Sequence, residues 1–269
     1  MLGVFDGQRA LAFATRLADE VGPRPAGSVA DAQAQVLIAD ALVSAGWSLL
    51  AQEVALPQGG ATQNLIGFRG PALPEGRFAV VGGHHDTVAG SPGANDNASG
   101  IGVLVALAEE LADEDPAVPV VLVAFGAEEY QPSSPREHHI GSEVHARDDG
   151  EGVIAMLSVD MVGNGDRTCI CWFDAGPASL AERLSAVATA EGVGDAVYVQ
   201  ARGDASDHGP YARRGVPAAL LWTGRDGRYH TPTDTSEHLR LADVQRAGDL
   251  ALAFVRSLRP DDLDGLDPA

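Results

Sequence analysis

The sequence predicts an α/β fold, a three-layer sandwich in which a mixed, mostly parallel sheet carries helices on both faces. Two observations predict it: strand and helix patterns alternate along the 269 residues, and several of the strand segments are continuous apolar runs. A strand that is apolar on both sides belongs in a sheet covered on both faces. We expect a single domain over residues 1–260 and a flexible tail over 261–269.

The spacing of apolar residues places the individual elements. Helical periods predict helices over 6–20, 29–46, 98–112, 178–190, 206–214 and 241–258. Apolar or alternating runs predict strands near 48–56, 63–69, 77–83, 118–126, 153–160, 168–173, 196–200 and 216–223. Ligands of such sheets bind beyond the carboxyl ends of the strands, so the polar residues at those ends are the candidate functional residues.

The charge of the chain excludes several classes of function. Acidic residues number 38 against 18 basic ones, which gives a net charge of −20, and all 18 basic residues are arginines. The absence of lysine excludes Schiff-base chemistry and a P-loop. A strongly acidic protein is also a poor partner for nucleic acid, because phosphate binding needs a basic surface.

We expect a cytoplasmic location, because the sequence shows no targeting signal and its two cysteines fit a reducing compartment. No stretch approaches the ~18 consecutive apolar residues of a membrane span, so no membrane association is expected. The first residues lack the basic and apolar regions of a secretory signal. Cys169 and Cys171 lie two residues apart in a strand-like run, where a disulfide rarely closes. We expect packed thiols, which fits a reducing compartment.

Side chains that commonly bind metals follow four of the predicted strands, and another stands just before the helix at 98–112. In chain order they are His84, Asp96, the pair Glu128–Glu129, Asp160 and His230. Taken singly, each has an ordinary explanation, such as a helix N-cap for the aspartate or a solvated pair for the glutamates. Their arrival at one edge of a sheet by accident is improbable. Imidazole and carboxylate together suit zinc or a similar divalent ion, so we expect a metal site there.

Five motifs surround these residues, and in chain order they are HHD, GANDNASG, GAEE, SVDMVGNG and YHTPTDT. They resemble the motifs of the co-catalytic dizinc aminopeptidases, peptidase family M28. The separations of 12, 33, 31 and 70 residues between the candidate ligands fit as well. Related aminoacylases and carboxypeptidases usually have a longer first gap and an inserted dimerisation domain, for which this chain has no room. The resemblance runs from residue 22 to the last helix and implies a phosphorylase/hydrolase-like fold of the zinc peptidase type.

The resemblance implies two Zn²⁺ ions, with other divalent ions as alternatives. His84 and Asp160 would bind one ion, Glu129 and His230 the other, and Asp96 would bridge the two. Such a pair, ~3.5–4 Å apart, holds a water or hydroxide between the ions.

Three neighbouring residues have other roles in the resemblance. Glu128 matches the general base, which takes the proton of the bridging water and later gives it to the leaving amine. Asp86 would lie behind His84 and orient its imidazole. Tyr229 matches a position at which some relatives stabilise the oxyanion, and simple packing is the alternative.

Several further histidines stand near the motifs. His85 is expected only to fill the first motif. Three more follow the Glu–Glu pair, in and after what resembles an insertion at 131–140: His138, His139 and His145. We expect these three to be loop residues, with contact to substrate or to an additional metal ion as the alternative.

We expect an aminopeptidase that removes N-terminal residues from peptides with a free N-terminus. Acidic groups at the site, among them Glu128 and Asp160, would hold the free ammonium. A free C-terminal carboxylate has no evident partner, because no arginine adjoins a ligand motif more closely than Arg228. Arg202 and Asp207 are candidate substrate contacts; for Asp207, as for the histidine after it, a structural role is the alternative.

Two other classes of function are alternatives. One is another amide hydrolase or an acyl-transfer enzyme on the same scaffold. Glutaminyl cyclases resemble this fold, and we take His84 as disfavouring that activity because those enzymes use one zinc. The other alternative is a catalytically inactive binding module, which the complete set of ligands together with Glu128 disfavours.

Overall fold

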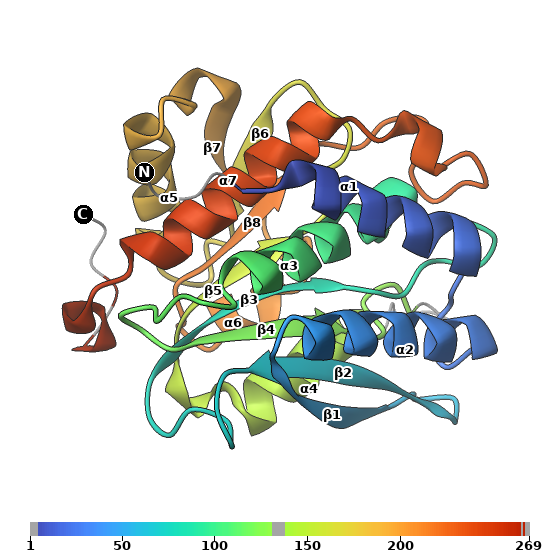
Figure 1. Cartoon of the computed structure of the whole chain (residues 1–269), viewed down its shortest axis with the longest axis horizontal. Coiled ribbons are helices and arrows are strands. Elements are labelled where there is room, and N and C mark those ends of the chain that lie inside the picture. The colour runs from blue at the N-terminus through green and yellow to red at the C-terminus, as the bar shows by residue number, and fades with distance from the viewer. Residues whose placement is uncertain (1–4, 131–137, 265, 267–269) are drawn as a thin grey trace.

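The computed structural model describes residues 5–130, 138–264 and 266, and these contain an eight-stranded sheet between layers of helices (Figure 1). The strand order is β1-β2-β4-β3-β5-β8-β6-β7. The strands are β1 (Ser48–Ala55), β2 (Ala61–Phe68), β3 (Phe78–His84), β4 (Val120–Phe125), β5 (Val153–Val159), β6 (Thr168–Trp172), β7 (Val197–Ala201) and β8 (Ala218–Trp222).

The sheet is mixed and mostly parallel, as predicted. At its centre β3 runs parallel to both β4 and β5, and β8 continues parallel beside β5. The outer strands β6 and β7 are also parallel to each other. Antiparallel pairs occur where β2 meets β1 and β4, and where β6 meets β8. The parallel centre brings the carboxyl ends of three adjacent strands, β4, β3 and β5, to one edge of the sheet.

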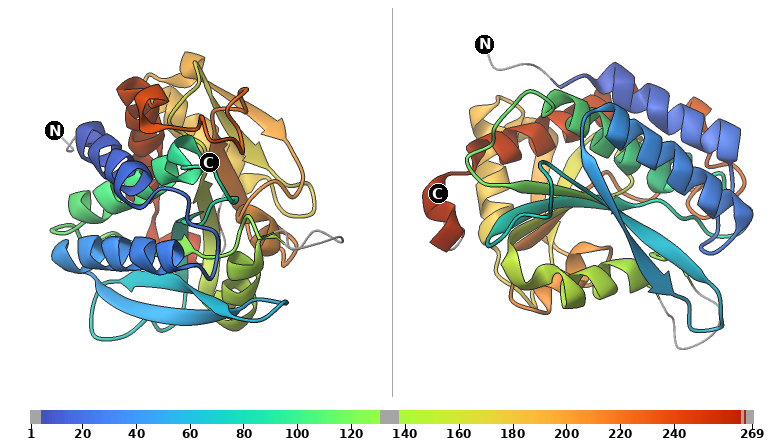
Figure 2. Two further views of the ribbon diagram at one scale, coloured as in Figure 1. Left: turned by 90° about the vertical axis from the view of Figure 1, so that its right-hand side faces the viewer. Right: turned by 60° about the horizontal axis from the view of Figure 1, so that its bottom comes forward.

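Helices cover both faces of the sheet. The first core contains side chains of α1 (Gly7–Arg16), α2 (Val29–Ser44), α3 (Ser99–Glu110), α5 (Ser179–Ala190) and α7 (Leu241–Ser257). The core on the other face contains side chains of α4 (Ile140–Asp148) and α6 (His208–Ala212). Figure 2 shows α4 across the sheet from α1, α2 and α3. None of these described helices has the length and apolar character needed to cross a membrane.

The two cores explain the apolar runs of the central strands. Side chains of a strand alternate between its two faces. In β3, Val81 therefore packs in the first core and Val80 in the second, and neither is exposed. A strand covered on both faces has no position for a solvated side chain, so its sequence is apolar throughout.

The first two helices begin at side-chain caps. The Asp6 carboxylate accepts hydrogen bonds from the backbone N–H groups of Gln8 and Arg9, at 3.1 and 3.2 Å. Ser28 Oγ accepts one from the N–H of Asp31 at 3.0 Å. Such caps satisfy N–H groups that the first helical turn leaves without a partner, and each is worth ~1 kcal/mol. The remaining predicted helices and strands also form, with ends shifted by a few residues.

Helix α4 is absent from the sequence prediction, which placed loop residues after the Glu–Glu pair. It begins at Ile140, and Ile140 and Val144 pack against Val54 and Leu56 beside β1. The helix has few other apolar residues, so its period is too weak to be recognised in the sequence. Residues 131–137 of the expected insertion lie outside the described residues.

The described part of the expected C-terminal tail packs onto the domain. Residues Pro260–Asp264 form a 3₁₀ turn. Within it, the buried Asp262 carboxylate accepts two hydrogen bonds from the Arg183 guanidinium, both at 2.8 Å. A paired, two-pronged contact of this kind fixes both side chains. Residues 265 and 267–269 of the tail lie outside the described residues.

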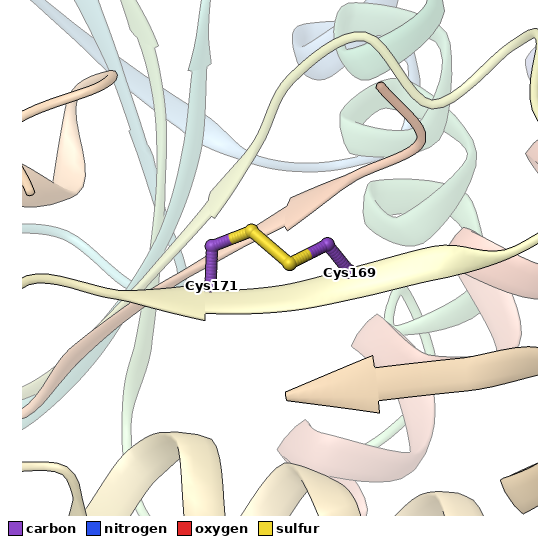
Figure 3. Close-up of a disulfide and its surroundings, with 2 residues drawn as sticks. All are labelled: Cys169 and Cys171. Atoms are coloured by element: carbon purple, nitrogen blue, oxygen red, sulfur yellow. A yellow bond between two sulfur atoms is a disulfide. The ribbon is translucent and has the colours of Figure 1, made fainter. Parts of the chain in front are cut away.

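Cys169 and Cys171 form a disulfide on β6, so the expectation of packed free thiols is wrong (Figure 3). Residues two apart on a strand point to the same face, and these Cα atoms lie 5.4 Å apart, within the range that a disulfide spans. Both cysteines are buried against Met161, Leu220 and Trp222. The pair therefore gives no support to the expected reducing compartment.

His145 of α4 generates a prediction about stability. Its ring is buried, and its Nδ1 is hydrogen-bonded to the Tyr211 hydroxyl at 2.6 Å. Burial lowers the pKa of His145 from its usual 6.5 to about 4. Between these two values the unfolded chain binds a proton that the folded protein excludes, so this group destabilises the fold as the pH falls through that window.

We expect the free energy of unfolding to fall between pH 7 and pH 4.5, and the variant His145→Gln to lose roughly 2–3 kcal/mol less than the wild-type protein over this range. Urea denaturation of both proteins at the two pH values measures the difference. Parallel losses in the two proteins would show that His145 does not contribute to acid sensitivity.

Candidate active site and metal centre

The predicted metal ligands meet at the carboxyl edge of the central strands. His84 is the last residue of β3, Asp160 follows β5, and Glu129 follows β4 after a short turn. Asp96 lies in the loop before α3, and His230 lies in the loop between β8 and α7. His84 is fully buried, and the three carboxylates are each no more than 7% exposed. Residues far apart in the sequence thus share one site, as expected.

The five side chains form two groups that share Asp96. In the first group, His84 Nε2 lies 3.3 Å from Asp96 Oδ1 and 3.4 Å from Asp160 Oδ1. In the second, His230 Nε2 lies 3.2 Å from Asp96 Oδ2 and 2.7 Å from Glu129 Oε1. The two oxygens of Asp96 therefore face different imidazoles. This is the arrangement that a carboxylate bridging two ions requires.

The donor atoms fit divalent ions. One ligand atom from each of His84, Asp96 and Glu129 lies within 4.8 Å of the others. His84 Nε2 and Asp160 Oδ1 are buried and have no hydrogen-bond partner among the described residues. Buried polar atoms normally have partners, so these two atoms point to a ligand. Nitrogen and oxygen donors of this kind suit zinc and related ions.

The charges of the site also favour cations. Burial, together with the charges of Asp96 and Glu128, raises the pKa of Glu129 well above its usual range. Burial disfavours a charged His230, but its contacts with Asp96 and Glu129 outweigh that effect and raise its pKa to about 10. Glu129 and His230 therefore both favour the protonated form, and metal ions would replace those protons as the neutralising charge.

Asp86 positions the Glu–Glu turn as well as the first histidine. Its backbone carbonyl lies 3.2 Å from His84 Nδ1, which leaves Nε2 directed toward the metal ligands. Its carboxylate accepts hydrogen bonds from the N–H groups of Glu128 and Glu129, at 3.0 and 3.1 Å. The sequence analysis expected Asp86 to orient the imidazole of His84; in the structure the Asp86 carbonyl is the nearer group, and the carboxylate Oδ1 lies 3.6 Å from His84 Nδ1. The Asp86 carboxylate therefore mainly holds the backbone of the turn that carries Glu128 and Glu129.

Among the residues that the structure describes, four other than glycine have left-handed backbone conformations, and each lies in or beside the site. They are Ala127, His139, Met161 and His230, with φ between 52° and 61°. This conformation is uncommon for residues other than glycine and persists where the surrounding contacts enforce it. The turns after β4 and β5 and the loop of His230 are therefore held in shapes that local sequence preference would not select.

The motif GANDNASG joins the Asp96 loop to the loop after β5. Three N–H groups of residues 161–163 donate to its side chains, at 3.2 Å to Asn97, 3.0 Å to Ser99 and 2.8 Å to Asn95. Asp234 adds a support that the sequence analysis did not identify. Its carboxylate accepts hydrogen bonds from the backbone N–H groups of Asn95 and Asp96, at 2.9 and 3.1 Å. The only sequence signal for Asp234 was its place in YHTPTDT.

Arg24 is a second support that the sequence analysis missed. The residue is fully buried, and its guanidinium donates to the carbonyls of His85, Pro92 and Gly93, at 2.6, 2.7 and 3.0 Å. These carbonyls belong to the loops that carry the first histidine and Asp96. Burial lowers the pKa of Arg24 to about 10, so it remains charged at neutral pH. Its position in the segment 22–28, where the family resemblance begins, was the only signal.

A cavity of about 260 Å³ lies beside the metal ligands. Carboxylates of Asp96, Glu128, Glu129 and Asp160 line one part of it. The rest is lined by Met161, Arg202, Asp204, Ala205, Leu220, Trp222, Arg225 and Tyr229. The site therefore offers carboxylates, an apolar wall and two guanidinium groups to one bound molecule.

Two arginines at the cavity correct the expectation that a substrate carboxylate has no partner. The Arg202 guanidinium lies over the ring of Trp222, 4.1 Å from its centroid, and that of Arg225 lies 4.3 Å from the centroid of Tyr229. Arg228 is two residues from His230 in the sequence and Arg225 is five, but Arg225 is the one that lines the cavity. Stacking on an aromatic ring fixes the plane of a guanidinium and leaves its N–H groups available.

Tyr229 stacks on the neighbouring ligand, with its ring centroid 3.6 Å from that of His230. Burial and the nearby charges of Glu129 and Asp96 raise the pKa of Tyr229, so its hydroxyl stays neutral and can donate a hydrogen bond into the cavity. Both alternatives of the sequence analysis, packing and oxyanion binding, are compatible with this position.

The structure places the two candidate substrate contacts, Arg202 and Asp207, in different surroundings. Arg202 lines the cavity, as expected of a substrate contact. Asp207 is fully buried at the start of the short helix α6 and is not among the lining residues, which agrees with the structural role that the sequence analysis gave as the alternative. Burial and the charge of Glu128 raise the pKa of Asp207 to about 7. The adjacent His208 is fully buried as well, in agreement with a structural role.

Three of the other histidines are buried and contact neighbouring polar groups, which the sequence analysis did not expect. His85 is buried, with Nδ1 3.2 Å from Asp31 Oδ1 and Nε2 3.0 Å from the carbonyl of Gln63. His139 and His145 are also buried. His145 lies within α4, so its prediction as a loop residue is wrong, whereas His138 and His139 precede the helix, as predicted. His139 Nε2 lies 2.9 Å from Glu128 Oε1. The reason is that α4 forms here and directs this segment back toward the site.

Solved structures with the same architecture include a zinc aminopeptidase and glutaminyl cyclases. A zinc aminopeptidase from Bacillus subtilis superposes with a TM-score of 0.85, at 19% identity, over 95% of each chain. A glutaminyl cyclase from an Acidobacteriales bacterium superposes with a TM-score of 0.81, at 24% identity, again over 95% of each chain. At these identities the likeness shows the fold alone.

The sequence defines the family. The chain belongs to peptidase family M28, whose model matches residues 64–255. It is 31% identical to the aminopeptidase YwaD of Bacillus subtilis over 206 residues, which are 72% of this chain and 44% of that enzyme. It is 28% identical to the uncharacterised protein YfbL of Escherichia coli over 271 residues, 87% of this chain and 82% of that protein. The resemblance inferred from the motifs is confirmed.

The position of Asp96 generates a prediction about metal content. We expect the purified protein to hold about two divalent ions per chain, as a carboxylate-bridged site does. Asp96→Asn should lose both ions, because Asp96 faces both imidazoles, whereas Asp160→Asn should lose mainly one. Elemental analysis after dialysis measures the content. The control is Asp166→Asn, whose side chain is 94% exposed and pairs with Arg240. Two ions retained in the Asp96 variant would contradict the bridging role.

Proposed function

We propose that this protein is a zinc-dependent aminopeptidase that hydrolyses N-terminal residues from peptides. The observation that carries the proposal is the division of the five ligands into two groups by the oxygens of Asp96, with Glu128 beside them at the cavity. Family membership and an aminopeptidase relative support it. His84 and Asp160 would hold one ion, and Glu129 and His230 the other.

The residues divide the chemistry between them. Two divalent ions bound there supply Lewis-acid activation of a water molecule and of the scissile carbonyl. The Glu128 carboxylate takes the proton of the attacking water and delivers it to the leaving amine. The neutral Tyr229 hydroxyl donates a hydrogen bond to the oxyanion of the tetrahedral intermediate. Asp86 holds the backbone of Glu128, so that the base keeps its place through both proton transfers.

Charged groups that line the cavity would bind groups of opposite charge on the substrate. The carboxylates that line one part of it favour the free N-terminal ammonium. Arg202 and Arg225 at another part favour a carboxylate of the substrate, in a side chain or at the end of a short peptide. The apolar wall of Met161, Leu220 and Trp222 accommodates the aliphatic portion between these charges.

Intramolecular acyl transfer is the second candidate activity, because glutaminyl cyclases share the fold. Both reactions need a general base near the N-terminal amine, so a peptide that begins with glutamine distinguishes them. Release of free glutamine and a shortened peptide indicates hydrolysis. Release of ammonia with formation of a pyroglutamyl peptide indicates cyclisation, and that outcome would replace the aminopeptidase proposal.

Exchanging each glutamate of the pair tests the roles of base and ligand. Glu128→Gln should keep both metal ions and lose ~10²–10⁴-fold in kcat, the usual contribution of proton transfer. Glu129→Gln should instead weaken the binding of one ion. Steady-state kinetics and elemental analysis of both variants, each prepared in the same way, separate the two roles. If both variants lose metal equally, the assignment is refuted.

Blocking each end of the substrate tests which charges are read. Acetylating the N-terminus removes the ammonium and adds bulk, so kcat/KM should fall by at least ~100-fold, about 2.7 kcal/mol. Amidating the C-terminus of a dipeptide should cost less, and that smaller loss should disappear when both Arg202 and Arg225 are replaced by alanine. An acetylated peptide cleaved at an unchanged rate would identify a deacylase or a carboxypeptidase on this scaffold.

A further inference from the structure

We propose that His139 is a positioning residue for Glu128, which it holds in the orientation that proton transfer requires. The inference rests on the proposed role of Glu128 as the general base. It begins from the contact between the two side chains, in which His139 Nε2 lies 2.9 Å from Glu128 Oε1. The His139 side chain is 4% exposed and that of Glu128 is 9% exposed, so the contact is shielded from water.

The backbone fixes the two residues relative to each other. The N–H of His139 donates to the carbonyl of Glu128 at 3.0 Å. The next two N–H groups continue the pairing, from Ile140 to the carbonyl of Ala127 and from Gly141 to that of Gly126, both at 3.0 Å. Three successive hydrogen bonds thus hold the start of α4 alongside the turn that carries the base. The side-chain contact is therefore set by the fold.

The conformation of His139 is one that the contact helps to explain. Its φ is 60°, in the left-handed region, and it immediately precedes the first residue of α4. Left-handed backbone is uncommon for residues other than glycine, with asparagine, aspartate and histidine enriched among the exceptions. Glycine would be the cheapest residue for this turn, but it has no side chain to place beside Glu128.

Charged groups alternate outward from the base. His139 Nδ1 lies 3.5 Å from Asp204 Oδ1, and Asp204 in turn contacts Arg213. Arg213 also reaches Glu143 of α4 at 3.0 Å. Each charge in this series has neighbours of opposite sign. The second ring nitrogen of His139 is therefore directed by an acidic partner, as in many carboxylate–histidine pairs.

The charge state of His139 agrees with this geometry. Burial disfavours the imidazolium, but Glu128, Asp204 and Asp207 outweigh that effect and raise its pKa to about 10. At neutral pH both ring nitrogens therefore carry protons, and each can donate to a carboxylate. With Oε1 of Glu128 engaged by His139, Oε2 is the oxygen that accepts the proton of the water.

Variants of His139 test the inference. His139→Asn keeps a residue that tolerates the left-handed backbone but is too short to reach Glu128, and we expect kcat to fall ~10–100-fold with KM nearly unchanged. His139→Gln retains an N–H donor on a longer side chain and should recover a large part of that loss. His145→Gln perturbs the same helix without a contact to Glu128, so it controls for effects on α4. Steady-state kinetics, metal content and thermal melts are measured for all three.

A double variant supplies the readout that a merely structural role would not produce. If His139 acts through Glu128, His139→Asn should cause no further loss of kcat in the Glu128→Gln background. An undiminished loss in that background, or wild-type kcat in His139→Asn, would overturn the inference. These outcomes are distinct from failure of the proposed function itself, which would appear as full activity of Glu128→Gln alone.

Discussion

The site depends on the placement of Asp96, whose two oxygens face two different imidazoles. A carboxylate can do this only if its backbone is held rigidly, since a rotation would bring both oxygens toward one group. The amides of Asp96 and its neighbour Asn95 donate to Asp234, and the loop carbonyls beside them accept from Arg24. The loop has little regular secondary structure of its own, so these side chains take the place of helix or strand hydrogen bonds.

A buried cluster of carboxylates is costly, and the structure offsets it in two ways. Buried cationic groups stand behind the ligands, with Arg24 as the fully buried example. Backbone N–H groups donate hydrogen bonds to a carboxylate behind the candidate ligands, since the Asp86 carboxylate accepts from the amides of Glu128 and Glu129. These groups do not fully balance the negative charge, because the pKa values of Glu129 and His230 are raised, which indicates a remaining requirement for positive charge. Divalent ions meet that requirement.

The cavity extends the same electrostatic pattern toward the substrate. Four carboxylates of the candidate metal site line it, and the guanidinium groups of Arg202 and Arg225, which also line it, lie over aromatic rings. The disulfide between Cys169 and Cys171 packs against Trp222 and Met161, which belong to the apolar part of that wall. A bound peptide would therefore meet charged groups and an apolar surface in one cavity.

The sequence by itself determined the fold class and the succession of the strands, and it predicted five candidate ligands, because apolar runs mark buried strands and polar residues at their carboxyl ends share one edge. Only the tertiary structure decided the closure of the disulfide, the left-handed turn at His139, its contact with Glu128, and the arrival of Arg225 at the cavity. Periodicity reports which face of an element is buried. It carries no information on which side chains from distant segments meet, because that depends on how loops pack and on which rotamers the packing allows.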